Sequence, residues 1–266
     1  MTANPASRWG LRVLGLGYLT MLLLIPLVMI FYKTFEEGIG PPLDAVTSPD
    51  GLHALKLTLL MVAIAVPLNT IFGIACALLL VRHKSKANGV IDAIINLPFA
   101  VSPIVIGLSL FLLYGTDGWF GFLADAGIKV LFSVPGMVLA SIFVSLPFVV
   151  RETVPVLQEI GTDQEMAAST LGANGWQTFW KITLPSIRWG VAYGVVLTTA
   201  RVLGEFGAVT IVSGSISGQT QTLPLFVEKQ YANFNSPGAY GAALVLALLA
   251  LITLLAMNLL KRKEDA

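Results

Sequence analysis

Residues 57–81 read LTLLMVAIAVPLNTIFGIACALLLV, an apolar run that contains no Asp, Glu, Lys or Arg. A helix needs about 20 apolar residues to cross the hydrocarbon core of a bilayer, and this run is long enough. Because that core holds no water, a crossing segment must satisfy its backbone groups internally, as a helix does. The stretch therefore predicts a transmembrane helix.

Five further apolar runs are also long enough to cross a membrane, and only the fifth of the six contains charged residues, Arg201 and Glu205. The first run is longer than the ~7–15-residue core of a signal peptide and has no small-residue cleavage site after it, so we expect it to be retained. The six predicted spans are Val13–Tyr32, Leu57–Val81, Ala93–Tyr114, Val130–Val150, Trp189–Val212 and Gly238–Leu260. The sequence thus predicts an all-α membrane protein in which residues 1–266 form one transmembrane domain.

The composition agrees with a membrane protein. Hydrophobic residues make up 56% of the chain and charged residues 12%, with a mean hydropathy of +0.81. A soluble domain carries about twice that charged fraction. The net charge of +1 provides no bulk attraction to nucleic acid. The single cysteine, Cys76, cannot form a disulfide within the chain, and no Cys/His cluster suggests a metal site.

The distribution of Lys and Arg predicts the orientation. Basic residues gather in the N-terminal segment, in residues 82–86, between residues 151 and 188, and after residue 260. The connections on the other side carry only Lys33, Lys56, Lys129 and Lys229. Because positive charge favours the cytoplasmic side, we expect both termini to be cytoplasmic. An even number of spans agrees.

Proline and glycine suggest local features of the bundle. Pro98 and Pro103 lie five residues apart, so the third span should not be a straight rod. Gly190 and Gly194 form a G-x-x-x-G pair, which permits close helix packing. The outer segment 33–56 contains three prolines and four acidic residues, and we expect an irregular, solvated connection there.

The connection between the fourth and fifth spans, residues 151–188, is long and rich in apolar residues at helical spacing. Gly172 and Gly175 interrupt the pattern and Pro185 is expected to end it, which predicts two short amphipathic helices with a glycine bend between them. Exposed Trp and Phe side chains need a partner surface. Periodicity alone does not show whether these side chains pack on the inner ends of this chain's own spans or on another protein.

Residues 165–172 read EMAASTLG, and after nine further residues 182–185 read ITLP. This pattern resembles the EAA motif of ABC importer permeases, in which the loop forms coupling helices that enter a groove on a separate ATPase subunit. The resemblance implies a type I ABC importer permease-like bundle. The residues matching the motif are Glu165, Met166, Ala167, Ala168, Gly172, Ile182, Leu184 and Pro185.

The match departs from the motif at one position. The family's Glu stands directly before the alanine pair, where this chain has Met166, and Glu165 lies one residue earlier. One residue turns a helical side chain by about 100°. The sequence leaves open whether Glu165 makes the family's usual polar contact or whether Met166 fills a pocket instead.

Residues 200–209 read ARVLGEFGAV, which resembles the A-R-x-x-G-E-F-G-A signature of sulfate, molybdate and tungstate permeases. Residues 97–103 (LPFAVSP), 113–115 (LYG) and 222–225 (TLPL) look like the W-type membrane subunit of sulfate/thiosulfate importers. The resemblance implies transport of sulfate or thiosulfate, with molybdate or tungstate as the alternative.

Arg201 and Glu205 stand at i and i+4 and therefore share a helix face. Ionisable groups at membrane depth are costly unless they are paired or hydrated. Arg201 and Glu205 form either a mutual ion pair that fixes helix packing or an anion site. In the second case Arg201 binds the anion and Glu205 keeps its affinity for the anion low. Ser102 is a further candidate for the anion pathway. The outer segment 219–231, with Gln221, Thr222 and Glu228, is either a solvated loop or a contact for a binding protein.

The resemblance also implies the partners and the location. These are a periplasmic sulfate-binding protein, a second, related permease, and a dimer of ATPase subunits that binds ATP and Mg²⁺, in a bacterial inner membrane. No phosphate-loop motif G-x-x-x-x-G-K-[ST] occurs in this chain, so we expect no ATPase activity and no cofactor of its own. A gradient-driven secondary transporter is the rival class, although the two halves show no internal repeat.

Overall fold

The computed structural model describes residues 5–83 and 85–262, in which all regular elements are helices. The first half contains α1 (Pro5–Leu19), η1 (Thr20–Leu24), α2 (Ile25–Phe35), α3 (Gly40–Thr47), α4 (Pro49–Arg82), α5 (Asn88–Ala100), α6 (Pro103–Tyr114) and α7 (Phe122–Asp125). The second half contains α8 (Val134–Ile160), α9 (Asp163–Thr170), α10 (Gly175–Thr178), η2 (Phe179–Thr183), α11 (Leu184–Leu203), α12 (Gly207–Ser213), α13 (Leu223–Ala232) and α14 (Ser236–Arg262). The segments η1 and η2 are π-helical turns within longer helices. Lys84 and Lys263, which contribute to the predicted charge bias, lie outside the described residues.

Within residues 5–83 and 85–262, four helices are long and apolar enough to cross a membrane, and two bent helix pairs could each supply one more span. The four are Arg12–Phe35, Pro49–Arg82, Val134–Ile160 and Ser236–Leu255. The bent pairs correspond to the third and fifth predicted spans. The prediction of an all-α, multi-pass membrane protein is confirmed, with four to six spans.

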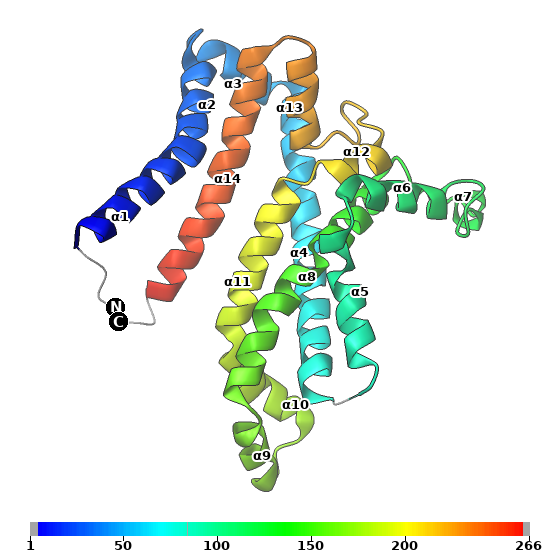
Figure 1. Ribbon diagram of the computed structural model, residues 1–266. Coiled ribbons are helices and arrows are strands. Elements are labelled where there is room, and N and C mark those ends of the chain that lie inside the picture. The colour runs from blue at the N-terminus through cyan, green and yellow to red at the C-terminus, as the bar shows by residue number, and fades with distance from the viewer. Residues whose placement is uncertain (1–4, 84, 263–266) are drawn as a thin grey trace.

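The third predicted span is divided between α5 and α6, which meet at an angle of 110°. The backbone of Val101 and Ser102 is extended between the two helices. Ser102 precedes Pro103, and proline disfavours the helical conformation for the residue before it. The expectation that this span is not straight is confirmed. Figure 1 shows α6 running across the direction of α4 rather than along it.

The centre of the bundle consists of α4, α8 and α11 (Figure 1). Two glycines of α11 lie directly on α8. A Cβ atom on Gly194 would lie 2.7 Å from Val149 Cα, and one on Gly190 would lie 2.7 Å from the carbonyl oxygen of Glu152. Since lipid tails are as apolar as leucine, close packing rather than water exclusion holds helices together inside a membrane. The predicted close approach at the G-x-x-x-G pair is confirmed.

The expectation of an irregular connection at residues 33–56 was wrong. The segment contains α3 and the first turns of α4. Pro41, Pro42 and Pro49 all lie in the first turn of a helix, where the missing N–H would have no intrahelical partner and the fixed φ suits the helix. Prolines at these positions begin helices instead of preventing them.

Figure 1 shows α3 and α13 at one end of the bundle and the short helices α9 and α10 at the opposite end. The first turns of α1 and the last turns of α14 point away from α3 and α13. The α9–α10 segment extends beyond the central helices and presents a surface at that end of the molecule.

Candidate functional site

The connection expected between the fourth and fifth spans contains two short helices. The helix α8 continues to Ile160 and ends at Gly161, whose φ is +63°. A second glycine, Gly172 (φ +85°), separates α9 from α10. Both angles lie in the left-handed region that favours glycine. The predicted pair of short helices with a glycine bend is confirmed.

Pro185 does not end the helical segment, contrary to the sequence-based expectation. It lies in the first turn of α11, and the π-helical turn η2 joins α10 to α11 without a break. A proline inside an α-helix clashes with the carbonyl four residues earlier. The wider π turn directly before Pro185 changes the backbone at this position, so the chain continues as a helix.

Four large apolar side chains of this segment are exposed, and together they are termed the α9–α10 apolar face: Met166, Leu171, Trp176 and Trp180. Leu171 is the most open, with an exposed fraction of 89%. Trp176 and Trp180 contact each other edge to face, with ring centroids 5.6 Å apart. These side chains form an exposed apolar surface, whereas Ile160 and Leu184 at the two ends of the connection pack on the chain's own spans.

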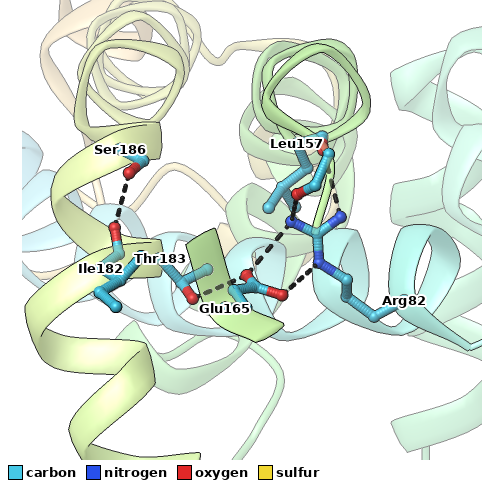
Figure 2. A network of polar contacts seen from close by, with 7 residues as sticks. Arg82, Leu157, Glu165, Ile182, Thr183 and Ser186 are labelled. Carbon is cyan, nitrogen blue, oxygen red and sulfur yellow. Dashed lines mark hydrogen bonds and ion pairs between the residues drawn. The ribbon is translucent and has the colours of Figure 1, made fainter. Parts of the chain in front are cut away.

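Glu165, by contrast, is partly buried and makes polar contacts within the chain (Figure 2). Its Oε2 lies 3.0 Å from Nε of Arg82, at the end of α4, and its Oε1 accepts a hydrogen bond from Nη2 of Arg82 at 3.2 Å. The hydroxyl of Thr183 in η2 donates to the same Oε1 at 2.8 Å. Arg82 also donates to the carbonyl oxygens of Leu157 and Gly161, at 3.2 and 2.7 Å.

The two residues at the shifted motif position differ in their surroundings. Met166 is exposed, whereas Glu165, about 100° away around the helix, is partly buried and paired with Arg82. Of the alanine pair, Ala168 is buried and Ala167 exposed. A hollow of about 590 Å³ lies beside the Arg82–Glu165 pair and is lined by both residues. The remaining motif positions are the exposed Gly172 and Pro185 and the half-buried Ile182 and Leu184.

The other candidate site lies where α11 gives way to α12, at a bend of 53°. Nη1 of Arg201 lies 2.6 Å from Oε2 of Glu205, and the exposed fractions of the two side chains are 29% and 1%. Oε1 of Glu205 accepts a hydrogen bond from the backbone N–H of Ala208 at 2.9 Å. Arg201 is in the last turn of α11 and Glu205 just before α12, so each charge complements the dipole of the nearer helix end. The pair thus joins the two halves of a bent helix.

The bend of the fifth predicted span lies against the third. A Cβ atom on Gly207 would lie 3.1 Å from Cβ of Pro103, and one on Gly107 would lie 2.8 Å from the carbonyl oxygen of Ala208. Ser102, at the break between α5 and α6, is exposed. Helix breaks in the two spans that carry the candidate pathway residues therefore pack close together.

The outer segment that contains Gln221 and Thr222 differs from both expectations. Each of these side chains is almost completely buried, so neither belongs to a solvated loop or an exposed contact surface. The backbone N–H of Leu223 donates to the hydroxyl of Thr58 on α4, which draws the start of α13 into the bundle. Of the residues proposed as a contact for a binding protein, Glu228 is exposed.

Sequence reasoning missed Arg82 and Thr183, the two partners of Glu165. Arg82 appeared only as one of the basic residues after the second span. It lies 83 residues from Glu165, and no local spacing rule connects positions so far apart.

The family model described as "Binding-protein-dependent transport system inner membrane component" matches residues 69–265. The chain belongs to this family. It is therefore a transport permease subunit of an ABC importer rather than an enzyme, and a multi-pass membrane protein.

Curated relatives match along nearly the whole length. The chain is 50% identical to the "Sulfate transport system permease protein CysW" of Synechocystis over 96% of this chain and 93% of that protein. It is 46% identical to the CysW protein of Escherichia coli, over 97% of this chain and 90% of the relative. The CysT sulfate permease protein of the same organism is 35% identical over 94% and 90% of the two chains. These matches confirm the resemblance to W-type sulfate permeases.

The solved structures that match show the fold. One is a bacterial ABC transporter involved in the import of the acidic polysaccharide alginate, with a TM-score of 0.80 and 18% identity over 96% of this chain and 94% of that chain. Another is the alginate transporter in complex with a periplasmic protein bound to an alginate pentasaccharide, with a TM-score of 0.79. The predicted ABC importer permease-like bundle is confirmed.

Proposed function

We propose that this chain is a membrane-spanning subunit of an ATP-driven importer that moves sulfate, or thiosulfate, into the cytoplasm by alternating access. The observation that carries the proposal is the identity of 46–50% to CysW sulfate permeases across more than nine-tenths of the chain. The similarity includes the bent spans with Ser102, Arg201 and Glu205, where an anion pathway would require polar groups.

The functional complex would contain several chains. CysT aligns with this chain along most of its length, which supports a second, related permease as partner. A periplasmic sulfate-binding protein would deliver the anion, and a dimer of ATPase subunits would bind ATP and Mg²⁺. The complex would lie in a bacterial inner membrane with both termini of this chain cytoplasmic, in agreement with the excess of basic residues on that side.

The α9–α10 apolar face supplies the docking surface for an ATPase subunit. A helical segment binds a groove through bulky apolar anchors, and three such residues are exposed here: Met166 in α9, Leu171 at the end of α9 and Trp176 in α10. ATP binding would close the ATPase dimer, move α9 and α10, and favour the outward-open state of the bundle. A ligand shifts such an equilibrium only by its difference in affinity for the two states.

Arg201 is our candidate for a transient partner of the anion. Its guanidinium is partly exposed while the carboxylate of Glu205 is buried beneath it. The carboxylate neutralises much of the positive charge, so a dianion would be attracted weakly and could leave again. Ser102, at the neighbouring helix break, could contribute a hydroxyl donor to the same path.

Reconstitution of the four kinds of subunit in vesicles tests the proposed function. Radiolabelled sulfate should accumulate with ATP and the loaded sulfate-binding protein, and no uptake should occur with an ATPase partner that cannot hydrolyse ATP. Uptake that persists with the inactive ATPase would favour a gradient-driven transporter. Competition by unlabelled thiosulfate, but not by molybdate or tungstate, is expected. Selective uptake of molybdate would instead support the alternative substrate class.

A further inference from the structure

Arg82 lies at a junction of four helical segments. Its guanidinium binds the carboxylate of Glu165 on α9 through two nitrogen atoms and donates to two carbonyl oxygens at the end of α8. The hydroxyl of Thr183 reaches the same carboxylate from η2, directly before α11. Figure 2 shows the arginine and the carboxylate between these segments. The exposed fractions of the two side chains are only 14% for Arg82 and 21% for Glu165.

The helix α9 has few other attachments to the bundle. Among its eight residues, Ala168 alone is buried, and Met166 points away from the bundle. An alanine contact is small and lets a helix slide. The Arg82–Glu165 contact is more restrictive, because a hydrogen bond from Nη2 to Oε1 and the 3.0 Å approach of Nε to Oε2 bring both carboxylate oxygens against one planar guanidinium. Only Gly161 and Thr162 link α9 to α8 along the chain, so the position of α9 relative to α4 depends mainly on the Arg82–Glu165 pair.

The electrostatics of the junction reinforce this arrangement. The carbonyl oxygens of Leu157 and Gly161 form the negative end of the α8 dipole, which attracts a cation. Glu165 lies in the first turn of α9, where a negative charge is favourable. Lysine could not replace Arg82, because its single ammonium nitrogen cannot contact both carboxylate oxygens of Glu165 and also reach two carbonyl oxygens.

We infer that Arg82 and Glu165 are positioning residues that transmit the movement of α9 to α4 and α8. The inference rests on the proposed function, in which the ATPase subunits move α9. In this role Glu165 acts within the permease and does not contact the ATPase. Its displacement pulls on the guanidinium, which is also bound to the end of α8, so the two central helices follow α9. Without the pair, the ATPase subunits still dock and hydrolyse ATP, but the bundle does not respond.

The quantity that tests this inference is the coupling ratio, the number of sulfate ions imported per ATP hydrolysed, in the complete reconstituted complex. We expect Arg82→Gln and Glu165→Gln each to lower the coupling ratio about tenfold. The complex should still assemble, and its ATPase rate should change by less than about twofold, because the α9–α10 apolar face is intact. Lys86→Gln is the matched control: this exposed cation lies four residues after Arg82, and its loss should leave the ratio unchanged.

Each outcome decides one question. A wild-type complex that hydrolyses ATP but imports no sulfate overturns the proposed function, whatever the variants do. If the wild type imports sulfate and Arg82→Gln keeps the same coupling ratio, the inference is overturned and the proposed function stands.

A single substitution could also prevent assembly, because it leaves one charge of a partly buried pair without its partner. The double variant Arg82→Gln/Glu165→Gln removes both charges and avoids that penalty. It should assemble and remain uncoupled. A double variant that fails to assemble, or that imports at the wild-type ratio, would show that the pair does not transmit movement.

Discussion

Two arginine–glutamate pairs lie at different places in the bundle and differ in their separation along the chain and in the burial of the carboxylate. Arg201 and Glu205 are four residues apart, and their carboxylate is 1% exposed. Arg82 and Glu165 are 83 residues apart, and both side chains are partly exposed. The first pair joins two halves of one bent helix, whereas the second joins helices from distant parts of the chain.

The difference indicates what each pair can do. A buried local pair fixes a bend, and it is costly to disturb because an unpaired charge would remain in an apolar region. A pair between separate segments holds those segments together, so that a movement of one is passed to the other. We therefore expect substitutions in the first pair to abolish the anion pathway and substitutions around the second to uncouple it from ATP.

The largest expected effect comes from Arg201→Gln. We expect sulfate uptake to fall about 100-fold, equivalent to roughly 2.7 kcal/mol, as for the loss of a hydrogen bond to a charged group. The measurement is uptake by the purified complex, with assembly checked by copurification of all subunits.

The double variant Arg201→Gln/Glu205→Gln separates the two roles of that pair. It leaves no unpaired buried charge, so the complex should be more stable than Arg201→Gln alone. Uptake should remain low if Arg201 is a partner of the anion. Recovery of uptake in the double variant would mean that the pair serves packing only.

A smaller effect is expected from Gly107→Ala, which tests whether the packing of α6 on α12 supports the Arg201–Glu205 pair. The new Cβ would lie 2.8 Å from the carbonyl oxygen of Ala208, whose N–H binds Glu205. We expect a loss of about 1–3 kcal/mol in stability, measured by thermal unfolding in detergent, and lower uptake.

Gly89→Ala is the control for this substitution. Gly89 lies at the start of α5, and nothing lies within 4 Å of a Cβ atom at this position. The Gly89→Ala variant should therefore be as stable as the wild type or slightly more stable. Equal stability of Gly107→Ala and Gly89→Ala would contradict the close packing at the two helix breaks.

The smallest effect is expected from Thr183→Val, which removes one hydrogen bond to Glu165 and leaves Arg82 in place. The loss of about 0.5–1.5 kcal/mol should lower the coupling ratio roughly twofold. Ser186→Ala is the matched control, because the Ser186 hydroxyl binds only the carbonyl oxygen of Ile182 in its own helix among the contacts drawn in Figure 2. If both variants behave alike, Thr183 has no part in the junction.

The comparison of the two pairs also explains how much the sequence could predict. The Arg201–Glu205 pair was predictable because residues at i and i+4 share a helix face. The same applies to the apolar spans, the bend near Pro103 and the contact of Gly194 with α8. Each depends on residues close together in the chain or on a property of a single residue type.

The features that sequence reasoning missed depend on tertiary contacts or on exact backbone geometry. No spacing rule joins Arg82 to Glu165. The buried state of Gln221 and Thr222 follows from the docking of α13 on α4, which a polar sequence does not reveal. The helices α3 and α4 could be predicted only by knowing that Pro41 and Pro49 lie in their first turns.

The π-helical turn at Phe179–Thr183 has a consequence for insertions and deletions. A π turn contains one residue more than an α turn. Because the extra residue is accommodated within one turn, removing one residue there would restore regular α-helical geometry and leave the direction of α10 nearly unchanged. Removing one residue from α10 itself, after Trp176, would instead turn Trp176 by about 100° about the helix axis. The segment that carries the docking surface can thus absorb a one-residue change at Phe179–Thr183 that α10 itself cannot.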